Sequence, residues 1–339
     1  MSDIPKLTRK DFISHRSVRW CPGCGDYAIL AQLQRTLPEL GIPKENIVFI
    51  SGIGCSSRFP YYMNTYGFHS IHGRAPTLAT GLKIANPDLS IWVITGDGDG
   101  LSIGGNHFIH AMRRNIDINV ILFNNRIYGL TKGQYSPTSP QGLRTKSSPM
   151  GSLETPFNPI SIALASEATF IARTFDTDLK HMAKMIKRAY AHKGISFIEI
   201  YQNCVIFNNK TWDYATNRKT RAENVVELEH GKPLIFGKNK DKAIRIKTFE
   251  PEIVSLDEVD EEQLMIHDEQ APSAIPYLLS RMRHPNLPEP IGVFRDVQMP
   301  TYEQGLLAQI DEAIQKKGEG KLSDLYHSAD MWTVESTKE

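Results

Sequence analysis

The chain has 339 residues, of which 40% are hydrophobic and 23% are charged, and its formal net charge is +1. This length allows about two domains, or one large α/β domain with an extension. The near-neutral charge gives no electrostatic argument for binding nucleic acid, and no apolar run approaches the roughly 20 residues that span a membrane. Residues 1–10 lack the apolar core of a secretory signal, so we expect a cytoplasmic protein.

The first 20 residues are polar and irregular with scattered basic side chains, and we expect them to lie over the surface of another part of the protein. They lead into the sequence WCPGCG at 20–25, in which Cys21 and Cys24 are two residues apart. Two such thiols can point at one metal ion or cluster. The alternatives are a redox disulfide of the thioredoxin type, which should follow a strand closely, and two inert thiols. No strand is predicted before Cys21.

A predicted helix over 27–40 is followed by a short buried strand over 46–51, which runs directly into the sequence GIGCSSR at 52–58. Cys55 therefore lies at the carboxyl end of a strand. A lone cysteine is usually a buried structural residue, but the flanking glycines and the position at a predicted site edge favour a functional role. Next, His72 and Arg74 precede a helix of small residues that ends near 86–87. They are either surface groups or contacts for an anion.

The stretch 91–130 predicts a buried strand at 91–94, a glycine turn at 96–100, a helix at 106–114 and a second buried strand at 119–123. Because parallel strands present their carboxyl ends at one sheet edge, Asp97 and Asn125 should lie close together there. Their oxygens suit a hard cation such as Mg²⁺, and a bare glycine backbone can approach a bound anion. The alternative is an ordinary strand–turn–helix unit with polar loop ends.

Residues 128–159 are irregular, as is typical of a lid or binding loop. A helix at 159–168, a strand at 170–175, an amphipathic helix at 178–192 and a strand at 195–201 follow, and Cys204 comes just after the last of these strands. From about 210 the chain is more polar, with hairpin-like alternation at 234–246 and helical patterns at 272–282 and 303–316. We predict an α/β fold with a doubly wound, mostly parallel sheet in 1–209, and a C-terminal extension in 210–339 that packs on the main domain or on a partner.

The four cysteines form one predicted site, because Cys55 and Cys204 close strands at one sheet edge. Four thiolates hold either a [4Fe–4S] cluster or a structural zinc ion. Zinc sites usually draw their ligands from two close pairs, whereas here one pair is joined by two single cysteines. This asymmetry favours a cluster.

Several motifs together resemble the β subunit of 2-oxoacid:ferredoxin oxidoreductases over roughly 20–209. They are WCPGCG, SGIGCSSR, HGRAP with the following ATG, GDGD with FNNRIYGLTKGQYSPT, and the strand that ends in Cys204. The sequence GDG, 25 residues and then NN also looks like the thiamine diphosphate fingerprint. The resemblance implies a thiamine diphosphate-binding fold, thiamine diphosphate with Mg²⁺, a [4Fe–4S] cluster and coenzyme A as co-substrate.

The resemblance also assigns residues. It implies that Cys21, Cys24, Cys55 and Cys204 bind the cluster. It implies that Asp97, Asn125 and the Ile127 carbonyl hold Mg²⁺. Further cofactor contacts would come from Gly54, Ser56, His72, Gly96, Gly98, Asp99 and Thr131. Arg58, Leu130 and Lys132 fall where such proteins line the substrate pocket.

In thiamine enzymes a glutamate activates the aminopyrimidine ring, and in this family it comes from the α subunit. No residue of this chain is a convincing substitute, so we expect a heteromer, as a dimer of heterodimers, that is active only with its α subunit. No run of closely spaced cysteines resembles a ferredoxin, so an external ferredoxin should take the electrons.

Arg58 and Lys132 add positive charge that favours 2-oxoglutarate as substrate, and the sequence PIGVFR at 290–295 also looks like the 2-oxoglutarate type. Pyruvate is the alternative substrate. The alternative classes are a non-oxidative thiamine diphosphate decarboxylase and a zinc-stabilised binding module.

Overall fold

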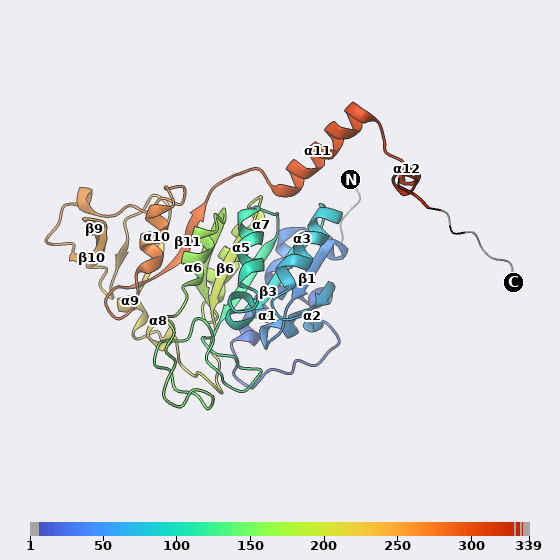
Figure 1. Ribbon diagram of the computed structural model, residues 1–339. Coiled ribbons are helices and arrows are strands. Elements are labelled where there is room, and N and C mark those ends of the chain that lie inside the picture. Colours follow the sequence, from blue (N-terminus) through green and yellow to red (C-terminus); the bar gives the residue numbers. More distant parts are fainter. Residues whose placement is uncertain (1–6, 329, 333, 335–339) are drawn as a thin grey trace.

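The computed structural model describes residues 7–328, 330–332 and 334. Eight strands form one sheet in the order β2-β1-β3-β4-β6-β5-β11-β7 (Figure 1). Their bounds are β1 Ile47–Ser51, β2 Tyr66–His69, β3 Ser90–Gly96, β4 Asn119–Asn124, β5 Phe170–Phe175, β6 Ser196–Tyr201, β7 Val225–Leu228 and β11 Glu289–Asp296. The first six strands run parallel, and β11 is antiparallel to β5. The predicted mostly parallel sheet is confirmed.

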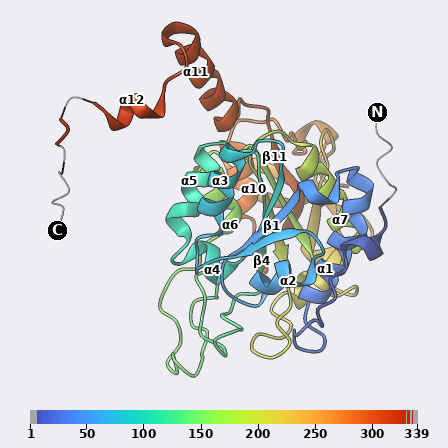
Figure 2. The ribbon, with the colours of Figure 1, turned by 90° about the vertical axis from the view of Figure 1, so that its right-hand side faces the viewer.

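Helices cover both faces of this sheet, which Figure 2 shows nearly edge-on. On one face lie α3 (Ala75–Ala85), α5 (Gly105–Arg113), α6 (Pro159–Ala165) and α10 (Ala274–Arg281), and on the other lie α1 (Asp26–Thr36), α2 (Phe59–Tyr62) and α7 (Leu179–Ala191). Every residue of β1, β4, β5 and β6 is buried. These strands therefore read as continuous apolar runs in the sequence rather than as alternating ones.

Predicted and observed element ends differ where local chemistry stops a helix. The helix expected over 27–40 ends at Thr36 and continues as a 3₁₀ turn over Leu37–Leu40, because Pro38 cannot donate to an α-helical hydrogen bond. The helix expected over 159–168 ends at Ala165, and Glu167 then turns the chain at a φ of 63°. The helix at 178–192 is confirmed as α7, with the Asp178 side chain accepting a hydrogen bond from His181 N at 3.0 Å.

The glycine turn predicted at 96–100 is a short helix, α4 (Asp97–Leu101), that begins directly after β3. The threonine that precedes Gly96 stabilises this connection, since Thr95 Oγ1 donates to Asp99 Oδ2 at 2.7 Å. The predicted irregular region is confirmed, because the described chain has no helix or named strand between Asn125 and Asn158. One bridge between Tyr128 and Gln134 closes its first part.

The segment after residue 210 is partly built into the sheet. β7 pairs with β11, and β11 pairs with β5 at the sheet edge. The predicted hairpin is a small antiparallel sheet of β8 (Ile235–Phe236), β9 (Lys242–Lys247) and β10 (Glu250–Ser255). The segment also holds the short helices α8 (Asp213–Thr216), α9 (Arg221–Asn224) and α12 (Leu322–Tyr326), together with α11 (Tyr302–Lys317), which extends away from the body (Figures 1 and 2).

No helix among the described residues is both long and apolar enough to cross a membrane. The sequence-based expectation about a secretory signal concerns residues 1–10, of which 1–6 lie outside the described part of the chain.

Candidate functional site

The carboxyl ends of β1, β3, β4 and β6 lie side by side at one edge of the sheet. A cavity of about 490 Å³, the inner cavity, opens there. It is lined by Ile53, Gly54, Cys55, His72, Gly96, Asp97, Gly98, Asp99, Asn125, Ile127, Tyr128, Gly129, Leu130, Thr131 and Gln134. This volume is typical of a cofactor site. The predicted meeting of Asp97 and Asn125 at one sheet edge is confirmed.

Asp97 is 2% exposed and is held by the loop that follows β4. Its Oδ2 accepts hydrogen bonds from Ser136 Oγ at 2.5 Å and Thr138 Oγ1 at 2.6 Å, whereas no side chain of the described residues donates to its Oδ1. Burial raises the pKa of Asp97 to about 6, against the opposing effect of these hydrogen bonds. A nearby cation would favour the ionised carboxylate. A carboxylate oxygen, an amide oxygen and the Ile127 carbonyl on one cavity wall are a donor set that fits Mg²⁺.

Asp99 lines the same cavity, but both of its carboxylate oxygens are used by the protein. Oδ1 accepts from Ile53 N at 2.9 Å, Gly73 N at 2.7 Å and His72 Nδ1 at 2.7 Å, and Oδ2 accepts from Thr95. Asp99 therefore ties the loop after β1 and the loop before α3 to α4. Its contribution to a cofactor site is to position Ile53 and His72.

Position 98 must be a glycine because the ring of Tyr128 packs directly against it. A Cβ at this position would lie 2.2 Å from Tyr128 Cε1, and the Tyr128 hydroxyl donates to the Gly98 carbonyl at 3.0 Å. The ring can pack on α4 only because the glycine has no side chain. Of the other predicted contacts, Thr131 is exposed at the rim of the inner cavity, and Ser56 is buried and is not among its lining residues.

The four cysteines line a second cavity of about 200 Å³, the cysteine cavity. Cys21 is exposed and the other three are partly buried. Gln202 Nε2 donates to Cys24 Sγ at 3.2 Å. A Cβ on Gly129 would lie 3.5 Å from Cys55 Sγ and 3.6 Å from Cys204 Sγ, which is ordinary van der Waals contact, so Gly129 lies directly beside both sulfurs.

The four cysteines line one cavity, so a single site could draw ligands from all of them. Four thiolates are a donor set that fits either an iron–sulfur cluster or a metal ion. Burial, aided by the charge of Asp26, raises the pKa of Cys24 well above its usual range and that of Cys55 to about 12. These thiols would therefore be ionised only when bound to metal.

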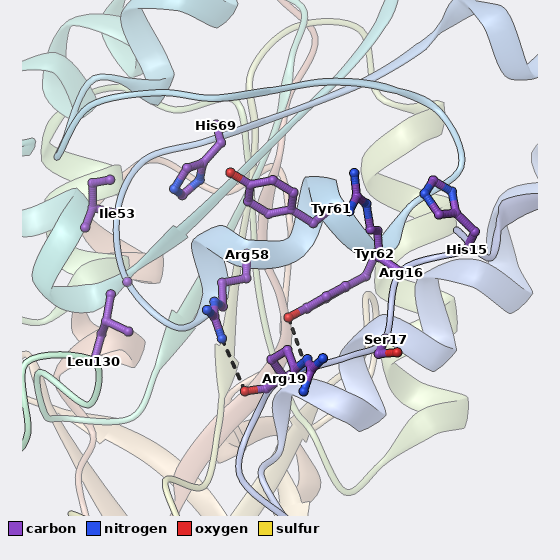
Figure 3. A pocket seen from close by; sticks show the side chains of 11 residues that line it. His15, Arg16, Ser17, Arg19, Ile53, Arg58, Tyr61, Tyr62, His69 and Leu130 are labelled. Atoms are coloured by element: carbon purple, nitrogen blue, oxygen red, sulfur yellow. Dashed lines mark hydrogen bonds between the residues drawn. The ribbon is translucent and has the colours of Figure 1, made fainter.

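The inner and cysteine cavities share a wall, because Cys55, Asn125, Gly129 and Leu130 line both. Leu130 also lines a third and wider cavity of about 730 Å³, the outer cavity, shown in Figure 3. Arg58 lines the outer and cysteine cavities, and its Nη1 donates to the Arg19 carbonyl at 3.2 Å. Lys132 lines the cysteine cavity but not the outer one, and its expected place in the substrate pocket stays a prediction.

The sequence did not predict that an N-terminal segment, residues 14–19, lines part of the outer cavity; we call this segment the N-terminal arm. His15, Arg16 and Arg19 line this cavity together with Tyr61 and His69 (Figure 3). Two hydrogen bonds from backbone N–H groups hold the arm on α2: Ser14 N donates to the Tyr62 carbonyl and Arg19 N donates to the Tyr62 hydroxyl. The arm thus lies over the surface of another part of the protein, as expected. The basic residues of the arm were the feature of the sequence that could have indicated its place at a binding cavity.

The loops around these cavities carry a one-sided charge. Residues 12–25, 52–75, 126–153 and 202–212 contain no Asp or Glu, although the whole chain has 38 acidic and 39 basic residues. Their basic residues are Arg16, Arg19, Arg58, Arg74, Arg126, Lys132, Arg144, Lys146 and Lys210. Such a surface attracts anionic substrates and partners.

Residues 52–200 match the family model described as thiamine pyrophosphate enzyme, C-terminal TPP binding domain. The chain is 51% identical over 330 residues to the 2-oxoglutarate oxidoreductase subunit KorB of Mycobacterium tuberculosis, covering 96% of this chain and 88% of that protein. It is 47% identical over 192 residues to the 2-oxoacid:ferredoxin oxidoreductase subunit beta of Saccharolobus solfataricus, covering 56% of this chain and 63% of that one.

A solved structure is also similar. It is described as 2-oxoglutarate:ferredoxin oxidoreductase from Magnetococcus marinus with 2-oxoglutarate, coenzyme A and succinyl-CoA bound. The match has 33% sequence identity and a TM-score of 0.76, and it covers 97% of this chain and 98% of that one.

Proposed function

Because the chain belongs to the β subunits of the 2-oxoacid:ferredoxin oxidoreductases, we propose that it takes part in the CoA-dependent oxidative decarboxylation of 2-oxoglutarate to succinyl-CoA, with electrons passing to ferredoxin. The observation that carries this proposal is the shared wall of the inner and cysteine cavities. It would hold an electron-rich reaction centre and an electron acceptor next to each other.

The inner cavity would hold thiamine diphosphate with Mg²⁺ on Asp97, Asn125 and the Ile127 carbonyl, and the four cysteines would hold [4Fe–4S]. When bound, thiamine supplies the electron sink for decarboxylation and the cluster accepts electrons singly. The protein's own part is positioning. Ser136 and Thr138 orient Asp97, Asp99 fixes His72 beside the cavity, and Gln202 donates to Cys24 Sγ.

Substrate choice would depend on Arg58. Its guanidinium lines the outer cavity, which joins the inner cavity at Ile53, Gly54 and Leu130. A distal carboxylate, which 2-oxoglutarate has and pyruvate lacks, would be favoured there by charge-assisted hydrogen bonds. The relatives and the solved structure named for 2-oxoglutarate support the same choice. Pyruvate is the alternative substrate.

The activating glutamate would come from an α subunit. No glutamate is among the lining residues of the inner cavity, and relatives of this chain are named as subunits of larger enzymes. We expect a dimer of heterodimers. The exposed apolar side chains of α11, Leu307, Ile310 and Ile314, are suited to contact with a partner subunit.

Ferredoxin would approach at exposed Cys21, where the surrounding loops lack carboxylates and so complement an acidic electron carrier. A site of four free cysteines suits a protein of the cytoplasm, because thiols are kept reduced in that compartment.

The test is cofactor analysis of the anaerobically purified complex, followed by viologen reduction with CoA and either 2-oxoglutarate or pyruvate. We expect iron and acid-labile sulfide, loss of both in Cys55→Ser, and faster reduction with 2-oxoglutarate. Arg58→Gln should raise KM for 2-oxoglutarate by about tenfold while changing KM for pyruvate little.

Four results would contradict the proposal. One zinc ion per chain in colourless protein would indicate the binding module, and CO₂ release without CoA or an electron acceptor would indicate a non-oxidative decarboxylase. Faster turnover of pyruvate would assign the other substrate. Activity of this chain without its partner would remove the role given to the α subunit.

A further inference from the structure

A fourth cavity, of about 190 Å³, lies between the end of the sheet and the C-terminal segment, and we call it the extension cavity. Its lining residues are Asn124, Arg126, Thr138, Pro156, Phe157, Asn158, Pro159, Arg173, Glu199, Tyr201, Trp212, Tyr214, Arg283, His284 and Glu289. None of these is assigned to the cofactors or to the 2-oxoacid. The lining is mainly polar, which distinguishes it from an empty packing defect.

The acidic side chains of this cavity are already neutralised by the protein. Arg173, which is 1% exposed, donates to Glu199 at 2.7 Å and to Glu289 at 2.9 Å. The Tyr201 and Tyr214 hydroxyls also donate to Glu289, at 2.6 and 3.0 Å. The two carboxylates therefore have little capacity left to bind a cation or another arginine.

Two further guanidinium groups line the cavity without an acidic partner. Among the described residues, neither Arg126 nor Arg283 forms an ion pair or a side-chain hydrogen bond. Arg126 Cζ lies over the Trp212 ring, 3.6 Å from the ring centre, and the N–H groups of its guanidinium form no hydrogen bond with the described residues. Arg283 is half-buried, and burial together with the charge of Arg281 lowers its pKa.

A partly desolvated cation without a counter-charge is costly, and an anion between the two groups would remove that cost. Arg126, Arg173 and Arg283 face two carboxylates, so the cavity wall carries a net positive charge even with its ion pairs formed. We propose that the extension cavity is a binding site for a small oxyanion, a carboxylate or phosphate held between Arg126 and Arg283.

The available space limits the size of that anion. A volume of about 190 Å³ equals roughly six water molecules at about 30 Å³ each, which admits inorganic phosphate or a short dicarboxylate and excludes a nucleotide. Planar guanidinium groups bind both carboxylate and phosphate with paired hydrogen bonds.

The site is joined to the inner cavity by buried hydrogen bonds. From Glu289 the contacts run through Arg173 to Glu199, and Asn124 Nδ2 donates to Glu199 at 2.7 Å. The Thr138 hydroxyl lies 3.0 Å from Asn124 Oδ1 and 2.6 Å from Asp97 Oδ2. An anion in the extension cavity would thus act on the network that orients Asp97.

Calorimetric titration of the purified complex tests this proposal. Sodium phosphate and sodium succinate are the two probes, each at constant ionic strength set with NaCl. We expect saturable binding of at least one probe with one site per chain, and the tighter of the two identifies the anion class.

Arg283→Gln should weaken binding by about tenfold or more, as expected for loss of a charge-assisted hydrogen bond. Arg281→Gln is the matched control. It removes the same charge from an exposed residue two positions earlier, at the last residue of α10 and outside the cavity, and should change the affinity less than about twofold. Arg283→Lys keeps the charge without the planar fork and should give an intermediate loss, which separates binding from misfolding.

Two outcomes would overturn the proposal. The first is the absence of saturable binding by either probe. The second is equal binding by the wild-type complex and a folded Arg283→Gln complex, which would place the bound anion elsewhere. Because no thiamine or iron is needed for the titration, failure here is distinct from failure of the proposed function.

Discussion

Replacing Glu289 with glutamine should strongly destabilise the sheet edge on which the C-terminal segment is built. Glu289 lies on β11, its side chain is 5% exposed, and it forms the buried pair with Arg173 at 2.9 Å. The substitution removes one charge of this pair and places amide hydrogens opposite a guanidinium. Loss of one partner of a buried pair costs about 3 to 5 kcal/mol. We expect the lower value, about 3 kcal/mol, because Glu199 still neutralises Arg173 in part.

Thermal unfolding of the purified complex measures this effect. For a chain of this size we use a shift of roughly 2 °C per kcal/mol, which gives a melting temperature about 6 °C lower for Glu289→Gln. Glu227→Gln is the matched control on neighbouring β7. Its side chain is 42% exposed and lies 3.7 Å from Lys184, so its loss should lower the melting temperature by less than about 1 °C.

A double-mutant cycle decides whether the ion pair is the cause. Arg173→Met should itself be destabilising, and combining it with Glu289→Gln should cost less than the sum of the two single effects. Strictly additive losses would show that the effect comes from packing alone. A Glu289→Gln complex that melts within about 1 °C of the wild type would refute the reasoning.

Three shorter predictions concern the site and the pH dependence. Gly98→Ala should weaken thiamine diphosphate binding by at least about tenfold, since its Cβ would displace the ring of Tyr128; Gly98→Ala combined with Tyr128→Ala should restore part of the affinity, and no rescue would contradict the steric explanation. Gln202→Met should make the cluster potential more negative in redox titrations followed by electron paramagnetic resonance, since the hydrogen bond to Cys24 stabilises the added electron; an unchanged or more positive potential would exclude this role. Burial raises the pKa of Asp296, but hydrogen bonds from a histidine and an arginine outweigh this effect and lower it. The ionised Asp296 carboxylate therefore stabilises the fold fully above about pH 4, the pKa of the unfolded state, and this stabilisation is lost as the pH falls through the lower folded-state pKa. Asp296→Asn should therefore melt below the wild type at pH 7, and the difference should shrink at pH 3; a difference independent of pH would be evidence against the ionised carboxylate.

Much of the site could be predicted because it depends on strand ends. Buried strands at 46–51, 91–94, 119–123 and 195–201 are visible as apolar runs. Parallel strands end at one sheet edge whatever the details of packing. That rule alone brought Cys55, Asp97, Asn125 and Cys204 together, and the structure confirms their convergence.

Other features could not be found this way, because they depend on contacts between distant segments. β2 is a short edge strand whose four residues are all exposed, so no buried apolar run marks it in the sequence. The residues of β11 were recognised only as part of a sequence motif and not as a strand. The position of β11 beside β5 depends on pairing between segments more than a hundred residues apart. The backbone of Lys132 has a positive φ of 75°, and its side chain lines the cysteine cavity, neither of which the sequence indicated.

The fold class, the family and the set of residues at the strand ends could thus be predicted from the sequence alone, because periodicity and motif spacing are local properties of the chain. Which of those residues are free to act depends on the tertiary structure. Both oxygens of Asp99 are occupied by the protein, the inner and cysteine cavities share a wall, and Arg126 and Arg283 line the extension cavity without an acidic partner among the described residues. Hydrogen-bond satisfaction and burial are properties of the folded whole, and no stretch of sequence contains them.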